Sequence, residues 1–314
     1  MRIVPVSSIP VCPNSSATTS PAPAPEPMWT EGSAEVNGVR LHYVSQGRGP
    51  LILFVHGFPE FWYAWRNQLA EFGRDHQAVA VDMRGYNLSS KPTDLDAYRI
   101  SNMVEDLRAL ADHFGAQKFV LVGHDWGGGI AWSFAIAHPE LLEKLVIINA
   151  PHPAIFAREL AQNPAQQRAS AYMLKFRSLA AEGMLSANHY AYLLGLFGNL
   201  LTNADAAEYG KAWSQPGALT GGLNYYRAAR LGPPESGGAS SAPPSATKVS
   251  VPTLVIWGER DPYLLTDNLN GLDAYVPQLI IKRLPDATHW VVHERPSEVN
   301  TLIREFVQSY ARSS

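Results

Sequence analysis

Short apolar runs that alternate with longer amphipathic stretches constrain the fold of this 314-residue chain more than any other feature. The first four runs are residues 51–55, 78–81, 119–122 and 145–148. Each is too uniformly apolar to leave one face in water, which is typical of parallel strands covered on both sides. The stretches between them have helical length and spacing, at residues 61–72, 101–114 and 128–137. The alternation predicts an α/β fold with a mostly parallel central sheet flanked by helices.

This alternation is interrupted once, after residue 150. Residues 151–231 contain no strand-like run and are rich in Ala, Leu, Tyr and Gln, so we expect several successive helices that form an inserted cap. Residues 232–247 are rich in Gly, Pro and Ser, a composition typical of a mobile connector. Two further strands, at 253–257 and 279–281, and a closing amphipathic helix at 297–310 then resume the pattern.

We divide the chain into four parts on this basis. They are a disordered tail rich in Pro, Ser and Ala (1–33), a first part of the core (34–150), the cap with its connector (151–248), and a second part of the core (249–314). An Asn-Gly turn between alternating residues within 36–44 predicts an antiparallel hairpin at the start of the core.

Composition limits the partners and the compartment. The chain has 25 Lys and Arg against 28 Asp and Glu, a net charge of -3, and no basic run that could follow a phosphate backbone, so we expect no nucleic-acid partner. The single cysteine, Cys12, can close no internal disulfide. Pro5 and Pro10 interrupt the candidate apolar leader, and no later segment approaches the roughly 18 apolar residues of a membrane span. We expect a cytoplasmic protein without a membrane partner.

Residues 119–128 read Phe-Val-Leu-Val-Gly-His-Asp-Trp-Gly-Gly, an apolar strand followed by Gly-x-Asp-x-Gly and the start of a helix. This order is typical of a nucleophile elbow, in which glycines flank a residue on a sharp strand-to-helix turn. Asp125 occupies the nucleophile position. A carboxylate is already ionised at neutral pH and can attack a saturated carbon directly, which indicates alkylation rather than acyl transfer. The pentapeptide alone is also compatible with a glycine-rich turn whose aspartate caps a helix.

An acid and a histidine follow in the order that elbow enzymes use. Asp261 and His289 each lie in a loop after one of the two later strands, at the edge where a parallel sheet places its site. Taken singly, each has an ordinary structural explanation. The ordered trio predicts instead that Asp261 orients His289, and that His289 takes a proton from water to hydrolyse an ester on Asp125. His189 and His293 belong to no motif.

The sequence His-Gly-Phe-Pro-Glu at 56–60 follows the first core strand. A glycine there lets the backbone approach a bound anion. We expect the backbone N–H groups of Phe58 and Trp126 to form an oxyanion hole for a tetrahedral intermediate. The same five residues would also suit an ordinary turn, but their place at the end of a core strand ahead of the elbow favours the functional interpretation.

These motifs, together with Asp-Met-Arg-Gly-Tyr at 82–86, resemble those of the α/β-hydrolase-fold epoxide hydrolases, and the similarity extends over about residues 36–310. The resemblance implies that Asp125 opens an epoxide ring while two tyrosines of the cap bind and protonate the departing oxygen. Tyr172 and Tyr226 stand where that pair is expected, with Tyr225 as the alternative to the second. Two phenols can hydrogen-bond an alkoxide without a metal, so no cofactor is implied.

The resemblance also implies supporting residues. Glu60 and His124 match positions that help to hold the hydrolytic water, and His56 and Gly57 adjoin the nucleophile with them. The expected reactants are a small apolar epoxide and water. The aromatic residues expected in the substrate pocket include Trp62 and Tyr225.

Two other functions remain open. Haloalkane and haloacetate dehalogenases use the same fold and the same catalytic residues, and the indole of Trp126 could bind a leaving halide. However, Phe58 stands where haloalkane dehalogenases have a second donor, an asparagine. A non-catalytic ligand-binding protein is also compatible with the fold, although it would not need a nucleophile, an acid and a base. The predicted tyrosine pair favours an epoxide as substrate.

Overall fold

A computed structural model describes residues 29–234 and 248–309, and an eight-stranded sheet forms its centre. The strands are β1 (Thr30–Val36), β2 (Val39–Gln46), β3 (Leu51–Val55), β4 (Gln77–Val81), β5 (Phe119–His124), β6 (Leu142–Ile148), β7 (Thr253–Gly258) and β8 (Leu279–Leu284). Their order across the sheet is β1-β2-β4-β3-β5-β6-β7-β8. The pairs β1 with β2 and β2 with β4 are antiparallel, and every other neighbouring pair is parallel.

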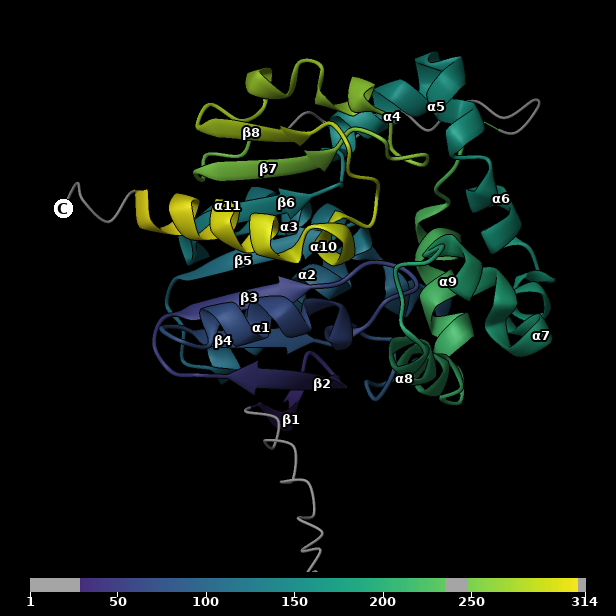
Figure 1. The fold of residues 1–314 in the computed structure, drawn as a ribbon, viewed down its shortest axis with the longest axis horizontal. Coiled ribbons are helices and arrows are strands. Elements are labelled where there is room, and N and C mark those ends of the chain that lie inside the picture. The colour runs from purple at the N-terminus through teal and green to yellow at the C-terminus, as the bar shows by residue number, and fades with distance from the viewer. Residues whose placement is uncertain (1–28, 235–247, 310–314) are drawn as a thin grey trace, which may run out of the picture.

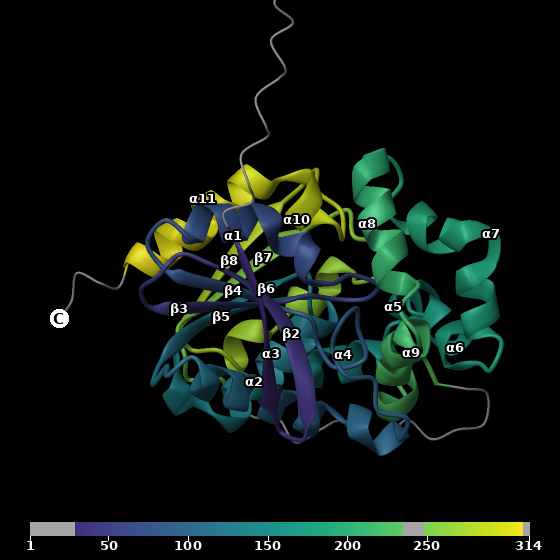
Figure 2. The same ribbon diagram turned by 90° about the horizontal axis from the view of Figure 1, so that it is seen from below.

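Helices cover both faces of this sheet. They are α1 (Arg66–Phe72), α2 (Ile100–His113), α3 (Trp126–Ala137), α4 (Pro153–Gln162), α5 (Pro164–Ala169), α6 (Tyr172–Arg177), α7 (Ala181–Leu196), α8 (Asn203–Trp213), α9 (Ala218–Ala229), α10 (Val291–Glu294) and α11 (Pro296–Ser309). Short 3₁₀ helices lie at η1 (Trp62–Trp65), η2 (Leu95–Tyr98), η3 (Pro139–Leu141), η4 (Thr266–Leu269) and η5 (Leu272–Ala274). Figures 1 and 2 place α1, α10 and α11 on one face of the sheet and α2 and α3 on the other.

The predicted α/β fold with a helical cap is confirmed. Every residue of β3 and β5 is buried, as expected for strands covered on both faces. Helix α3 ends at Ala137, directly before the His-Pro pair at 138–139, because proline disfavours helical backbone in the residue that precedes it. The hairpin is also present, with a turn at Asn37 and Gly38, both of which have positive φ.

The structure differs from the prediction at the start of the core. Strand β1 begins at Thr30, because residues 30–33 pair with residues 42–45 of β2, so the core starts before residue 34. Residues 1–28 of the predicted tail, residues 235–247 of the predicted connector, and Tyr310 lie outside the described residues.

The cap consists of helices α4 to α9 and lies beyond the carboxyl ends of the parallel strands. In Figure 1 the arrowheads of β3, β7 and β8 point towards the side on which α5 to α9 lie. Helix α7 is divided by residues 187–190, whose dihedral angles are not helical. None of the helices in the described part of the chain is long and apolar enough to cross a membrane. The fold thus brings the cap over the strand ends where Asp125, Asp261 and His289 were predicted.

Candidate active site

The turn from β5 to α3 places Asp125 in a constrained backbone conformation. Its φ is 51° and its ψ is -120°, outside the regions that L residues ordinarily occupy. The turn is tight because α3 starts against the neighbouring strand: a Cβ at Gly127 would lie 2.2 Å from the backbone oxygen of Val55. A glycine is therefore required at 127, and the Asp125 side chain is directed away from the sheet, into a cavity.

The Asp125 carboxylate lies between the 56–60 loop and His289. Its Oδ1 accepts a hydrogen bond from the backbone N–H of Phe58 at 2.8 Å. Its Oδ2 lies 3.6 Å from Nε2 of His289. Gly57 permits this approach, since a Cβ there would lie 2.4 Å from Cβ of Asp125. The second predicted donor, the N–H of Trp126, belongs to the first residue of α3, where a helix offers it no internal partner.

Asp261 and His289 form a hydrogen-bonded pair beside the nucleophile. Nδ1 of His289 lies 2.7 Å from Oδ2 of Asp261. The other Asp261 oxygen, Oδ1, accepts hydrogen bonds from the backbone N–H groups of Tyr263 and Leu264 at 2.8 and 2.9 Å. Asn149, which follows β6, donates from Nδ2 to Oδ2 of Asp261 at 2.8 Å. These contacts hold the carboxylate so that it orients the imidazole, with Nε2 of His289 directed towards Asp125.

The charges around His289 control its protonation. Burial lowers its pKa, but the carboxylate of Asp261 and the more distant carboxylate of Asp125 outweigh this effect and raise the pKa to about 9. His289 is therefore protonated at neutral pH while Asp125 carries its charge. Removal of that charge lowers the pKa of His289, because one of the groups that stabilise the imidazolium is then neutral.

Tyr172 and Tyr226 come from different cap helices, α6 and α9, and line the same cavity as Asp125 and His289. Their ring centroids are 6.3 Å apart. Burial raises the pKa of both phenols well above the usual value, and the negative charge of Asp125 adds to the effect in each. Both hydroxyls are therefore protonated and able to donate a hydrogen bond to an oxygen anion.

Two cavities of unequal size meet at Asp125 and Tyr172. The smaller, about 30 Å³, is the chamber at His289 and is also lined by Phe176, Tyr192, Leu196 and Trp290. The larger, about 620 Å³, lies on the Trp126 side between the core and the cap, and its wall includes Phe156, Ala157, Leu160 and Leu264. Because most of its wall is apolar, the larger cavity suits an apolar group of substantial size.

A buried polar cluster supports the site from behind. Glu60 accepts from Tyr209 and lies 2.5 Å from Nε2 of His293 and 3.0 Å from Nδ1 of His124. Nε2 of His124 lies 2.9 Å from the backbone oxygen of His289. Burial alone would raise the pKa of Glu60, but His293 and His124 hold it well below its usual range.

Some of the residues that support the site were not predicted from the sequence. His293 matched no motif, yet it lies four residues after His289, a spacing that places two side chains on one side of a helical segment. Asn149 was also missed, although a polar residue directly after an apolar strand is a signal for a site at a sheet edge. His56 contacts the backbone on both sides of its ring: its Nδ1 lies 2.8 Å from the Gly57 oxygen, and its Nε2 accepts from the N–H of Met83.

Two predicted pocket residues do not reach the cavities. Of the described residues that line either cavity, none is Trp62 or Tyr225. Trp62 packs against the rings of Trp29 and Phe61 instead. Tyr225 precedes Tyr226 on α9 and so projects in another direction, where its hydroxyl donates to the backbone oxygen of Arg84 at 2.8 Å. Tyr225 therefore does not replace Tyr226 as a phenol of the site.

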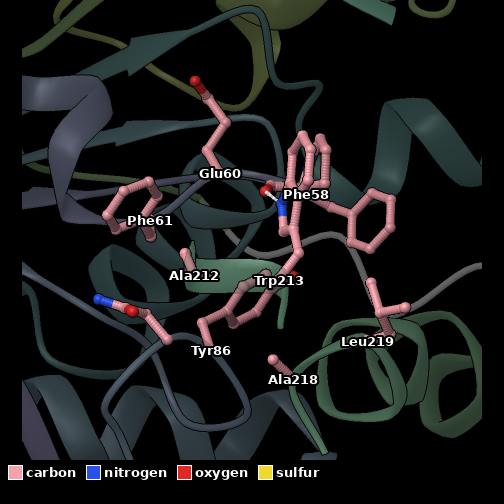
Figure 3. Close-up of a pocket in the computed structure, with 10 residues that line it drawn as sticks. Phe58, Glu60, Phe61, Tyr86, Ala212, Trp213, Ala218 and Leu219 are labelled. Carbon is pink, nitrogen blue, oxygen red and sulfur yellow. Dashed lines mark hydrogen bonds between the residues drawn. The ribbon is translucent and has the colours of Figure 1, made fainter. Parts of the chain in front are cut away.

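The 56–60 loop also faces a small pocket on its other side (Figure 3). Here Nε1 of Trp213, the last residue of α8, donates to the backbone oxygen of Pro59 at 2.6 Å. Figure 3 shows the carboxyl end of Glu60 pointing away from Tyr86 and Ala218, which lie across this pocket. The loop that carries the Phe58 N–H is thus held by the cap on one side and by the Glu60 cluster on the other.

Comparisons with known proteins place the chain among related sequences. The sequence profile of the alpha/beta hydrolase fold family matches residues 50–296. Epoxide hydrolase 4 of Mus musculus is 38% identical over 290 residues, which cover 88% of this chain and 78% of that protein. AB hydrolase superfamily protein YfhM of Bacillus subtilis (strain 168) is 39% identical over 282 residues, with coverage of 87% and 96%. A mutant of an epoxide hydrolase from Bacillus megaterium, complexed with its product (R)-3-[1]naphthyloxy-propane-1,2-diol, has a TM-score of 0.81 at 38% identity, with coverage of 88% and 99%.

The tight turn predicts opposite effects for two glycines of α3. Gly127→Ala should lower the free energy of unfolding by about 1–3 kcal/mol, because its methyl group would overlap the Val55 backbone. Gly129→Ala should be neutral or stabilising by up to about 1 kcal/mol, because beyond its chain neighbours and the backbone of its own helix no heavy atom lies within 4 Å of the added Cβ. Urea unfolding monitored by circular dichroism measures both, and equal effects would contradict the close approach at 127.

The position of Asp125 predicts a shift in the titration of His289. Asp125→Asn should lower the pKa of His289 below the wild-type value of about 9, because a carboxylate that raises it becomes neutral. NMR titration of the imidazole C–H signals measures the shift. Asp112→Asn, which removes an exposed carboxylate from α2, is the matched control and should leave the titration unchanged. An unchanged pKa in Asp125→Asn would mean that the nucleophile does not act on the ring.

Proposed function

Because the chain belongs to the α/β hydrolase fold family and, within it, to the epoxide hydrolases, we propose that it hydrolyses an epoxide to a vicinal diol through a covalent ester on Asp125. The groups that surround the Asp125 carboxylate are the main support for this proposal. Asp125 contacts the Phe58 N–H and His289, and two protonated phenols line the same cavity. This arrangement provides a nucleophile, acids for a leaving oxygen and a base for water without a further group.

In the first step Asp125 opens the ring. Oδ1 is held by the Phe58 N–H, which leaves Oδ2 to attack an epoxide carbon. A bond forms between Oδ2 and that carbon, and the bond from the carbon to the epoxide oxygen breaks. The electron pair of the broken bond goes to the oxygen, which takes a proton from Tyr172 or Tyr226. The product of this step is a hydroxyalkyl ester of Asp125.

The loss of charge at Asp125 prepares the second step. The negative carboxylate raises the pKa of both phenols and of His289, and the ester no longer carries that charge. The pKa values of all three groups therefore fall as the ester forms. The phenols become better acids when the alkoxide needs a proton. His289 can then release its proton, which returns the phenolate left by ring opening to a phenol, and His289 becomes a base.

In the second step water cleaves the ester. Neutral His289, oriented by Asp261, takes a proton from water, and the resulting hydroxide attacks the carbonyl carbon of the ester. The negative charge of the tetrahedral intermediate develops on Oδ1, where the N–H groups of Phe58 and Trp126 stabilise it. The bond from the carbonyl carbon to the ester oxygen then breaks, and the diol oxygen takes its proton from His289. Asp125 is left as a carboxylic acid and gives its proton to the neutral His289, which restores the starting charges of both groups.

The two unequal cavities support an asymmetric substrate. We propose an epoxide with one bulky apolar substituent, held in the cavity of about 620 Å³, and a small substituent or hydrogen on the other carbon, in the chamber of about 30 Å³. The diol bound to the related Bacillus megaterium enzyme carries one naphthyloxy arm, which supports the same substrate class.

Displacement of halide by the same aspartate receives less support. Two of the three relatives described above are named epoxide hydrolases. Two phenols also line the cavity of the nucleophile, where a leaving oxygen needs a proton and a leaving halide does not. Two parallel assays separate the two activities. One measures diol formed from an epoxide, and the other measures free halide released from an alkyl halide with the same carbon skeleton.

A single turnover in heavy-oxygen water tests the covalent scheme. We expect the label in the peptide that contains Asp125 and not in the first diol released, because water attacks the carbonyl carbon of the ester and not the substrate carbon. Mass spectrometry of both products measures this. Label in the first diol, with none in Asp125, would contradict the scheme. In His289→Gln we also expect an adduct that adds the full mass of the epoxide, and Asp125→Asn is the control that should form none.

The wall of the larger cavity predicts a change in substrate preference. Ala157→Phe, on the cavity side of α4, should lower kcat/KM for an aryl epoxide about tenfold or more and leave a short alkyl epoxide little affected, because the added ring occupies the space of the bulky arm. Ala161→Phe adds the same ring to an exposed position of α4 and should change neither. Steady-state kinetics with the two substrates measure the ratio, and equal losses for both would contradict the assignment of the arm to this cavity.

A further inference from the structure

Two buried side chains connect the cap to the core beside the catalytic groups. We propose that Tyr225 and Gln166 are positioning residues with separate tasks: Tyr225 holds Tyr226 for ring opening, and Gln166 holds the Asp261 loop for ester hydrolysis. Both are fully buried, and neither is among the described residues that line the two cavities of the site. The inference rests on the proposed function, because it assigns each residue to one of the two steps.

Tyr225 fixes α9 to a loop of the core. Its hydroxyl donates to the backbone oxygen of Arg84 at 2.8 Å. That acceptor is rigid, because the Arg84 guanidinium makes two hydrogen bonds to the buried carboxylate of Asp106, at 2.6 and 2.5 Å, and a third to the Ala97 oxygen. The hydrogen bond from Tyr225 therefore ties the cap helix to a part of the core that cannot easily move.

The backbones of α9 and this loop also touch. A Cβ at Gly221 would lie 2.3 Å from the Gly85 oxygen, so the helix can dock this closely only with glycine at 221. The Trp126 indole packs edge-on against the rings of both Tyr225 and Tyr226, with centroids at 5.5 and 5.0 Å. Since Tyr226 is the next residue of the same helix, the place of its hydroxyl in the cavity that Asp125 also lines depends on how α9 packs on the core.

Gln166 makes the corresponding connection from α5 to the loop after β7. Its Nε2 donates to the Tyr263 oxygen at 2.8 Å, and its Oε1 accepts from the Leu265 N–H at 3.0 Å. Nδ2 of Asn268 donates to the same Oε1 at 2.8 Å. One cap side chain thus fixes this loop on both sides of Leu264.

The segment that Gln166 holds is the one that binds the catalytic acid. The N–H groups of Tyr263 and Leu264 both donate to Oδ1 of Asp261. If the loop shifts, the Asp261 carboxylate shifts with it and no longer orients His289. Ring opening uses Asp125 and the phenols, and this loop contributes to it only part of the cavity wall, through Tyr263 and Leu264, whereas hydrolysis requires the Asp261 and His289 pair.

The two assignments predict opposite kinetic defects. Rapid-quench single turnovers with styrene oxide measure formation of the alkyl-enzyme and its hydrolysis separately. Tyr225→Phe, which keeps the ring and loses one hydrogen bond, should slow formation roughly 10- to 100-fold and leave hydrolysis unchanged. Gln166→Met should slow hydrolysis by a similar factor and affect formation far less. Each variant therefore serves as the control for the other.

A second readout separates positioning from general destabilisation. Asp261 raises the pKa of His289, so Gln166→Met should lower the apparent pKa in the pH profile of hydrolysis, and Tyr225→Phe should not change it. Thr253→Val is the control for the loss of a buried hydrogen bond. It removes the 2.8 Å bond from the Thr253 hydroxyl to the Val251 oxygen, which lies entirely within the core, and it should alter neither step.

The outcomes decide between the inference and its premise. If the wild-type enzyme forms no alkyl-enzyme from any epoxide, the proposed function itself is wrong. Wild-type turnover with both variants slowed equally in both steps, or with neither slowed, would overturn the positioning roles alone. If Gln166→Met does not fold, Gln166→Glu keeps the acceptor for Leu265 and loses the donor to Tyr263, and the same selective loss of hydrolysis is expected.

Discussion

The charge of one carboxylate contributes to the protonation of three groups around it. Asp125 is held at the sharp turn from β5 to α3. Burial is the main cause of the raised pKa of the two phenols, and Asp261 is the main group that raises the pKa of His289, but the negative charge of Asp125 raises all three pKa values further. Because all three depend on the same charge, a reaction that neutralises it changes all three at once. The proposed sequence of acid catalysis followed by base catalysis therefore needs no separate conformational switch between the steps.

The chemistry is divided between parts of the chain that must be held together. The nucleophile and the base come from strand ends of the core, and the phenols come from α6 and α9 of the cap. Parallel strands bring their carboxyl ends to one edge by topology alone. The cap has no such constraint, so its position depends on specific contacts such as those of Trp213, Tyr225 and Gln166 with core loops.

This division explains how much of the structure could be predicted from the sequence. The strands, the elbow at Asp125 and the order of Asp261 and His289 follow from local patterns, which hydrophobic spacing and glycines reveal. His293 and Asn149 have only weak local signals, a spacing and a place after a strand, which do not identify their partners, and the hydroxyl contact of Tyr225 has none. Their roles depend on which segments meet in space, and a buried side chain that bonds to a distant backbone oxygen leaves no local pattern.

Glu60 illustrates how such a contact joins separate catalytic segments. A buried carboxylate is costly unless charged or polar donors surround it, and Glu60 has His124, His293 and Tyr209. Glu60 lies two residues after Phe58, and His124 directly precedes Asp125 and also contacts the His289 backbone oxygen. One carboxylate thus connects the 56–60 loop, the elbow at Asp125 and the segment that carries His289. Its burial cost is offset only when these segments are in place, so the folded state favours the arrangement that catalysis requires.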